Sequence, residues 1–187
     1  VNDGVVYVGS DDNKLYAVDT NMGTKQWDFM RDYGGYSLFG LQSSPTVVND
    51  TVYVGSDNHH LYAISTNTGT KRWSFETNGE VRSSPTVVDG TVYVIYNATY
   101  VGALDASTGK KKWSLKINLP VTSSPTVVDG TVFVGSVDNN LHAVNAETGS
   151  EEWAFETETD GRVESSPTVA DGTVFVGSTD NNLYAID

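Results

Sequence analysis

Short hydrophobic runs alternate with polar turns along the whole chain. In one stretch, the run 125–128 leads into Asp129-Gly130, and the run 131–134 follows. Asp-Gly between two such runs predicts a β-hairpin, because its turn needs positive φ at positions that Asp tolerates and Gly adopts freely. Turn residues at 135–140 and 148–149 then separate two further runs. The pattern predicts four strands in this stretch.

A helical pattern is missing from the sequence. No stretch repeats its hydrophobic residues at the spacing of a helix over several turns, so we expect an all-β chain. Runs such as 91–94 are apolar on both faces, which suits sheets covered on both sides by neighbours. The radially stacked blades of a β-propeller provide that environment, although a β-sandwich of short strands gives similar local signals.

Self-repetition favours the propeller, because a sandwich does not need a long period. The segment Ser-Ser-Pro-Thr-Val recurs at intervals of 40, 40 and 42 residues, and the four tryptophans are 46, 40 and 40 residues apart. We therefore expect an all-β fold that is a β-propeller, or an arc of one, with about five four-stranded blades in a single domain of residues 1–187. The repeat units are about 1–42, 43–82, 83–122, 123–164 and 165–187. The first and last units are incomplete, so we expect either five blades with trimmed ends or a piece of a seven- or eight-bladed ring.

The chain is strongly acidic, which limits the classes of partner. It carries 24 Asp and Glu against 11 Lys and Arg, a formal net charge of −13, and this charge opposes binding to nucleic acid or anionic lipid headgroups. The acidity fits either a protein of a salt-loving organism or an ordinary acidic secreted domain. No hydrophobic run is long enough to span a membrane. The start at Val1, without an initiator Met or a signal peptide, is interpreted as a processed end or a cloning boundary.

The stretch Ala103–Trp113 carries the signature of a known repeat family. It reads Ala-Leu-Asp-Ala-Ser-Thr-Gly-Lys-Lys-Lys-Trp and resembles the A-x-D-x-x-T-G-x-x-x-W tryptophan-docking motif of pyrroloquinoline-quinone-like (PQQ-like) propeller repeats. In other copies, Ser65 and Asn145 replace the Asp, and Met22 replaces the Thr. The resemblance implies that the tryptophans pack between adjacent blades, so we expect them to be largely buried. These structural docking residues are Trp27, Trp73, Trp113 and Trp153.

The PQQ-like family includes quinone-dependent alcohol and sugar dehydrogenases. For these enzymes the resemblance implies a quinone stacked over calcium, a carboxylate base and often a disulfide of adjacent cysteines. The chain has no cysteine, and it has no tryptophan beyond the four repeat positions. We therefore expect no catalytic, cofactor-binding or metal-binding residue and no enzymatic activity. Non-catalytic members of the family resemble the propeller lipoprotein of the bacterial outer-membrane barrel-assembly machinery, which is a scaffold.

Positions that vary between units are free for function, whereas positions that repeat are structural. The residue before Ser-Ser-Pro differs in every unit. If the first strand of each blade is innermost, these four side chains ring one mouth of the central channel. The alternative is that they are unconstrained loop residues. The four residues are Gln42, Arg82, Thr122 and Glu164.

The loop at 30–42 lengthens the first tryptophan interval by six residues relative to the others. It carries Tyr33, Tyr36 and Phe39 among glycines, which favours contact with a protein or a carbohydrate. We expect this loop to share one rim with the four variable residues. The third unit also departs from the pattern, with Ile95-Tyr96 in place of Gly-Ser, so its outer edge is expected to be distinct.

Asp- and Asn-rich hairpins at 57–58, 138–140 and 180–182 offer oxygen atoms that resemble calcium ligands. Turn chemistry explains them more simply, because these side chains cap their own backbone, and the spacing of a calcium-binding EF-hand loop is absent. We expect these hairpins on the face opposite the variable rim.

The three histidines are not expected to bind a metal. His59 and His60 are adjacent on an extended hairpin and point in opposite directions, and His142 takes a position that is Tyr in three sister units. We expect all three at the surface.

The function expected from these observations is that of a non-catalytic PQQ-like propeller, a protein-interaction or scaffold module with a protein or glycan partner. Two glycosylation sequons, at Asn49 and Asn97, point weakly to a location outside the cell or in its envelope. The alternatives are a fragment of a quinone-dependent dehydrogenase and a carbohydrate-binding or sensor propeller.

Overall fold

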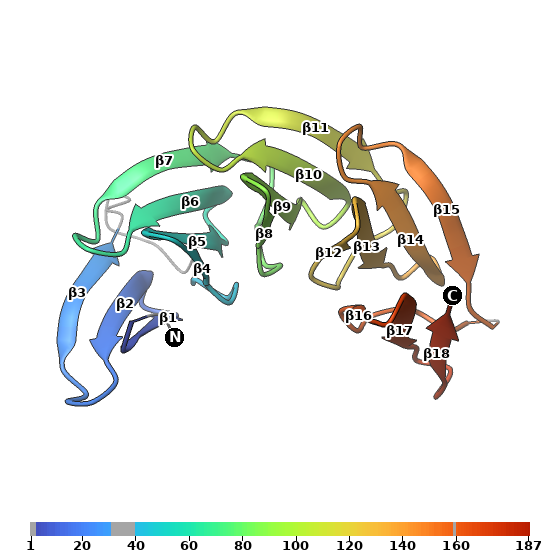
Figure 1. Cartoon of the computed structure of the whole chain (residues 1–187), viewed down its shortest axis with the longest axis horizontal. Helices are drawn as coiled ribbons and strands as arrows, with labels where there is room; N and C mark the ends of the chain where they lie inside the picture. The colour runs from blue at the N-terminus through green and yellow to red at the C-terminus, as the bar shows by residue number, and fades with distance from the viewer. Residues whose placement is uncertain (1–2, 31–39, 159) are drawn as a thin grey trace. The chain divides into compact units, whose positions relative to one another are not determined.

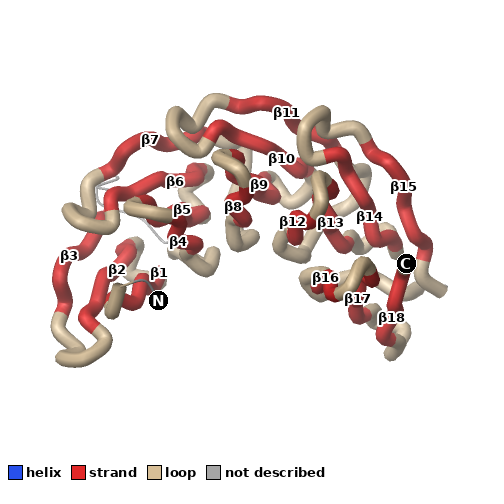
Figure 2. Tube along the Cα trace, in the orientation of Figure 1, coloured by secondary structure: helices blue, strands red, loops and turns tan. Residues whose placement is uncertain are grey.

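The computed structural model describes residues 3–30, 40–158 and 160–187. In these ranges every regular element is a β-strand and none is a helix (Figure 2). The prediction of an all-β chain is confirmed. The described strands form five antiparallel sheets, one for each repeat unit, of which three have four strands and two have three.

The chain forms two compact units, Val1–Pro85 and Thr86–Asp187. The first unit holds the sheets β1-β2-β3 and β4-β5-β6-β7 (Figure 1). Its strands are β1 (Val5–Gly9), β2 (Lys14–Asp19), β3 (Lys25–Met30), β4 (Thr46–Val48), β5 (Thr51–Ser56), β6 (His60–Ser65) and β7 (Lys71–Glu76).

The second unit holds the sheets β8-β9-β10-β11, β12-β13-β14-β15 and β16-β17-β18. Its first four strands are β8 (Thr86–Val88), β9 (Thr91–Tyr96), β10 (Tyr100–Asp105) and β11 (Lys111–Lys116). The others are β12 (Thr126–Val128), β13 (Thr131–Gly135), β14 (Asn140–Asn145), β15 (Glu151–Glu156), β16 (Thr168–Ala170), β17 (Thr173–Gly177) and β18 (Leu183–Ile186). That both units form one domain stays a prediction.

The sheets of the third, fourth and fifth repeats begin with the Asp-Gly hairpin that the sequence predicts. In the fourth repeat, Asp129 has φ 48° and Gly130 has φ 79°, so both central residues of the turn have positive φ. Asp89-Gly90 and Asp171-Gly172 adopt the same conformation. The twist of such turns matches the twist of the strands that they join.

The tryptophan of each repeat lies opposite an alanine. Trp113 pairs with Ala103, and Trp153 pairs with Ala143, each directly before a β-bulge in the sheet. The same bulge follows the corresponding alanine in the two sheets of the first unit. A small cross-strand neighbour leaves room for the indole, and the bulge bends the outer strand at this point.

The hydrophobic core of each unit consists of strand residues from successive sheets. In the first unit, Tyr7 and Leu15 of one sheet cluster with Val52 and Ile64 of the next. In the second unit, Val101 of the third repeat lies in one cluster with Val134 of the fourth. The two-sided apolar character of the strands is therefore explained by packing on both faces.

Within each unit, a hydroxyl-to-carbonyl contact joins the first strand of one repeat to the proline of the next Ser-Ser-Pro-Thr segment. Thr46 Oγ1 donates to the carbonyl of Pro85 at 2.5 Å in the first unit. In the second unit, Thr86 Oγ1 donates to Pro125 O at 2.6 Å. Pro85 and Pro125 lie directly before β8 and β12, outside the strands, so their carbonyls are available as acceptors. The repeated Ser-Ser-Pro-Thr segment thus has a structural role.

Candidate interaction surface

The variable residue of each repeat is exposed between two anchored neighbours. Around Arg82, Val81 is fully buried and its N–H donates to Ser56 O at 3.1 Å. Around Thr122, Val121 and Ser123 are buried, and Ser123 Oγ accepts a hydrogen bond from Gly135 N at 2.7 Å. The connection between repeats is held on both sides, and the residue between the anchors faces solvent.

Glycine allows this connection to approach the preceding sheet closely. At Gly135, a Cβ atom would lie 2.5 Å from the carbonyl oxygen of Val163, which no ordinary contact permits. Gly55 faces Val81 in the same way.

The third repeat has Ile95 at the position of this glycine. There the N–H of Val121 donates to Ala98 O of the hairpin at 2.6 Å. In the second and fourth repeats the equivalent N–H donates to the carbonyl of the serine that follows the glycine. Tyr96 and Tyr100 stack with ring centroids 5.4 Å apart beside Gly102. The third repeat therefore differs from the others at this end of its sheet.

Arg82 is held in place by two carboxylates of its own unit. Its Nε lies 3.0 Å from Asp57 Oδ1, and one terminal nitrogen lies 3.3 Å from Asp57 Oδ2 and 2.9 Å from Glu80 Oε2. The Asp57 side chain is only 6% exposed, whereas that of Arg82 is 56% exposed. The hydrogen bond that Arg82 donates to the Asp57 carboxylate raises the pKa of Arg82. The result is a fixed, exposed guanidinium on an acidic protein.

These contacts correct the predicted position of the Asp-Asn hairpins. Asp57 belongs to such a hairpin and contacts Arg82, and the N–H of Val163, the neighbour of Glu164, donates to Ser136 O at 3.0 Å. The hairpins lie at the same end of the sheets as the variable residues, so the expectation of opposite faces was wrong. The reason is strand direction: in an antiparallel meander, the second turn and the connection to the next repeat both follow strands that run the same way.

The four variable residues are all exposed, and they divide between the units. Gln42 and Arg82 belong to the first unit, and Thr122 and Glu164 belong to the second. That they ring one channel mouth stays a prediction. The loop residues Tyr33, Tyr36 and Phe39 lie outside the described residues.

Two of the three histidines are buried, which corrects the expectation that all lie at the surface. His60 and His142 are each 7% exposed, whereas His59 is exposed. His142 Nδ1 lies 2.9 Å from Glu151 Oε1, and its Nε2 lies 3.0 Å from Asp138 Oδ2.

The sequence contained a signal for this burial. His142 occupies the position of tyrosines such as Tyr184, whose hydroxyl donates to Asp180 Oδ2 at 2.6 Å. A shared position in the repeat implies a shared environment, and in both repeats the side chain binds an Asp of the hairpin.

Two tryptophans dock on a glycine turn of the next repeat in their own unit. Trp27 Nε1 donates to Thr66 O at 2.7 Å, and a Cβ at Gly69 would lie 2.8 Å from its indole. Trp113 Nε1 donates to Ala146 O at 2.9 Å, and a Cβ at Gly149 would lie 2.5 Å from its ring. Such close approach requires glycine.

Burial differs among the four indoles. Trp73 is 9% exposed, and Trp27 and Trp113 are half-buried. Trp153 is 38% exposed, so the expectation of large burial was wrong for this residue. The physical reason is that, among the described residues, no glycine turn lies against the Trp153 ring as Gly149 lies against Trp113.

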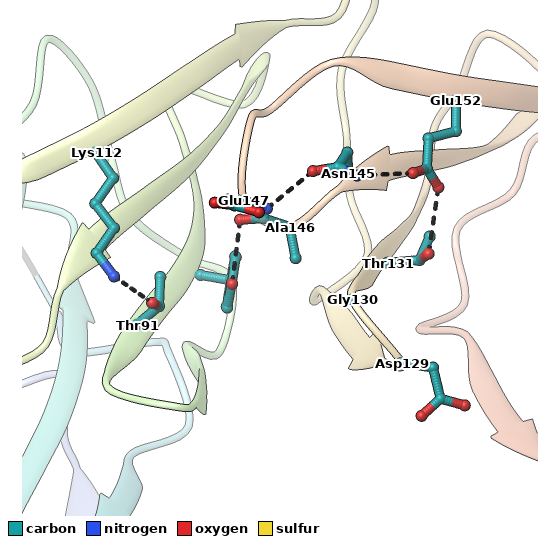
Figure 3. A pocket seen from close by; sticks show the side chains of 10 residues that line it. Thr91, Lys112, Asp129, Gly130, Thr131, Asn145, Ala146, Glu147 and Glu152 are labelled. Atoms are coloured by element: carbon teal, nitrogen blue, oxygen red, sulfur yellow. Dashed lines mark hydrogen bonds between the residues drawn. The ribbon is translucent and has the colours of Figure 1, made fainter.

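A pocket of about 390 Å³ opens at the other end of the sheets in the second unit. Figure 3 shows Lys112 on one side and Glu147 and Glu152 on the other. Lys112 Nζ donates to Thr91 Oγ1 at 2.6 Å, and Glu152 accepts a hydrogen bond from Asn145 Nδ2 at 2.9 Å. The pocket is lined by polar groups of opposite charge.

Among the described residues, no group of three or more His, Asp or Glu side chains is arranged to hold a metal ion. The described residues also include no helix long and apolar enough to cross a membrane.

The repeat geometry agrees with a family match along the chain. The family described as "Outer membrane protein assembly factor BamB" matches residues 1–55, 30–120 and 97–187. The chain belongs to this family. The resemblance to PQQ-like propeller repeats is confirmed, and the fold is of the β-propeller class. A search of curated protein sequences finds no match.

Solved structures with the same fold include a BamB protein, a quinohemoprotein alcohol dehydrogenase and a designed protein. BamB from Moraxella catarrhalis is 21% identical with a TM-score of 0.83, over 100% of this chain and 56% of that one. Quinohemoprotein alcohol dehydrogenase from Comamonas testosteroni is 17% identical with a TM-score of 0.78, over 100% of this chain and 40% of that one. The computationally designed Ika8 protein is 15% identical with a TM-score of 0.85, over 100% of this chain and 56% of that one. The chain thus spans little more than half of these proteins or less, and the likeness concerns the fold alone.

Proposed function

We propose that this chain is a non-catalytic scaffold module that binds a protein partner at the cell envelope. The partner engages the end of the sheets that carries Gln42, Arg82, Thr122 and Glu164. The description of the family as an outer membrane protein assembly factor supports a protein partner and an envelope location.

The observation that carries the proposal is the fixed Arg82. Most exposed arginines lose side-chain entropy when they bind, but Arg82 is already held by Asp57 and Glu80. Arginine is also enriched among the residues that dominate protein interfaces. An exposed, variable and immobilised side chain on a repeated frame is a suitable specificity element.

Site-specific photo-crosslinking tests the proposal in the source cells. A benzophenone amino acid replaces Gln42 or Thr122 in turn, and the matched controls are Met22 and Ser107, which are exposed at the opposite end of their sheets. We expect one and the same protein to crosslink at the first two positions and not at the controls. Equal crosslinking at all four positions, or different proteins at Gln42 and Thr122, would contradict the proposal.

The contribution of Arg82 needs a double variant. Arg82→Ala alone would leave the buried Asp57 unpaired and destabilise the protein, so Asp57→Asn accompanies it. We expect R82A/D57N to fold and to capture the crosslinked partner at least tenfold less efficiently. If the double variant folds and captures the partner as efficiently as the unmodified chain, Arg82 does not belong to the binding site.

A quinone-dependent dehydrogenase fragment is the second candidate, favoured by the quinohemoprotein dehydrogenases that share the fold. It requires saturable binding of pyrroloquinoline quinone, which is measured by absorbance in the presence of calcium. The scaffold proposal expects no saturation. Saturable, stoichiometric binding would favour the enzyme.

A further inference from the structure

The outer strand of the third repeat carries a strip of positive charge. Lys110, Lys111, Lys112 and Lys116 are all exposed, and no acidic residue lies between them. These are four of the 11 basic residues of a chain with net charge −13. The strip therefore stands out against the charge of the whole protein.

Basic residues at the equivalent positions of the first unit have acidic or polar partners on the same sheet. Lys25 forms an ion pair with Asp28, and Arg72 forms one with Asp50. The hydrogen bond from Arg72 lowers the pKa of Asp50. Lys71 lies 3.4 Å from Ser74 Oγ. In these strands much of the positive charge is neutralised locally.

On β11 this neutralisation is missing. Ser114 stands at the position of Asp28, and Lys112 bonds only to the neutral Thr91 hydroxyl. The side chains of Lys110, Lys111 and Lys116 form no ion pair or hydrogen bond in the part of the chain that the structure describes. Their charge is available to a partner.

The sister strand β15 shows that the fold does not require lysine here. Its equivalent residues are Glu151, Glu152 and Glu156. Charged residues on an edge strand ordinarily protect it against unwanted pairing, and glutamate serves that purpose in β15. A charge of either sign therefore suits the outer strand, and the choice of lysine gives β11 a charge opposite to that of β15.

We propose that β11 is a docking strand for an extended acidic segment of a partner protein. β11 is the last strand of its sheet, so its outer edge is free to pair within the described residues. Lys111 and Lys116 are five residues apart, about 17 Å along a strand, so a fitting segment carries carboxylates at a similar spacing. Main-chain pairing supplies affinity and the charges fix the register.

The strip is one strand wide, which favours a peptide over other anionic partners. Lys112 shares its pocket with Glu147 and Glu152 of the next sheet (Figure 3). A nucleic acid duplex or an anionic bilayer is broad enough to meet these carboxylates as well, and their repulsion opposes binding. A single extended segment along β11 avoids them. This surface is additional to the one around Arg82 and does not depend on it.

Fluorescence anisotropy with a labelled peptide of alternating Glu and Thr tests the proposal at low salt. The variant K111E/K112E/K116E gives β11 the charges of β15, and circular dichroism checks that it is folded. We expect saturable binding to the unmodified chain and at least tenfold weaker binding to the variant. Binding should also weaken strongly at high salt, because the pairs are exposed. R82A/D57N should bind the peptide unchanged, which separates this test from that of the proposed function.

Hydrogen exchange locates the bound peptide, with slower exchange expected for the amides of β11 and not for those of β15. An alternating Lys and Thr peptide is the charge control. Absence of saturable binding, equal binding by the triple variant or equal binding of the lysine peptide would overturn the proposal. Tighter lysine-dependent binding of a DNA duplex or of phosphatidylglycerol vesicles would overturn it in favour of those partners.

Discussion

The third and fourth repeats of the second unit share one frame and differ in surface charge. Both sheets pair a tryptophan with an alanine and place a bulge after that alanine. At equivalent outer positions one carries Lys111 and Lys116 and the other carries Glu151 and Glu156. The comparison shows that the frame depends on the repeated residues, whereas the sign of the charge on the outer strand is free to change.

The same two repeats also differ in whether their tryptophan docks on a glycine turn. The Trp113 indole lies on the glycine turn of the fourth repeat, whereas no described glycine turn lies against Trp153, which is 38% exposed. Two chemically identical residues in equivalent positions therefore differ in environment. The predictions below use that difference.

The largest effect is expected from Trp113→Ala. Removing this indole leaves a cavity against Gly149 and removes its hydrogen bond to the Ala146 carbonyl, so we expect a loss of about 3 kcal/mol in the free energy of unfolding. Trp153→Ala should cost about 1 kcal/mol, because a more exposed residue loses less packing. Urea unfolding of both variants measures the difference. Equal losses would show that docking on the glycine turn adds no stability.

An intermediate effect is expected from Gly149→Ala. Its φ is 75°, and the added Cβ would lie 2.5 Å from the Trp113 ring, so both strain and overlap destabilise the variant. Gly130→Ala is the matched control, because Gly130 has φ 79° and nothing within 4 Å of the added Cβ. We expect a loss of about 1 kcal/mol for the control and about 2 kcal/mol in total for Gly149→Ala. Thermal and urea unfolding measure both, and similar losses would mean that the indole moves aside without cost.

The smallest effect concerns Asp105 and acid. Hydrogen bonds from Ser107 and Thr108 lower the pKa of Asp105 to about 2, whereas Asn145 accepts equivalent bonds without a charge. A lowered pKa contributes stability that is present above the unfolded-state pKa of about 4 and is lost as the pH falls toward 2. We expect Asp105→Asn to be less stable than the unmodified chain at pH 6, with a gap that closes between pH 4 and pH 2. Urea midpoints across this range measure the gap, and a gap that widens in acid would contradict the assignment.

Local sequence rules predicted the turns and strands well, because the residues that form them recur in successive repeats. Asp129-Gly130 predicts its turn from backbone chemistry alone, and the tryptophan intervals predict the order of the sheets. The burial of His142 was missed because histidine was judged by its usual polarity instead of by its shared position with Tyr184.

The pairing of Arg82 with Asp57 could not be predicted from the sequence. The two residues are 25 positions apart, and no local pattern connects them. Their contact depends on the approach of the connection to the hairpin, which Gly55 permits through three-dimensional packing.

The hydroxyl-to-carbonyl link between Thr46 and Pro85, and again between Thr86 and Pro125, has a consequence for how such chains evolve. Each of the four repeats with a Ser-Ser-Pro-Thr segment offers the same donor and the same acceptor, so a duplicated repeat finds matching partners on both sides without any compensating mutation. Tandem duplication or loss of whole repeats is therefore structurally tolerated, and the longer interval of 42 residues before Pro167 still keeps the link, because Thr126 Oγ1 donates to Pro167 O at 2.5 Å. The number of blades in this family is therefore expected to change by whole repeats, with the breakpoints of duplication or deletion in the Ser-Ser-Pro-Thr segment.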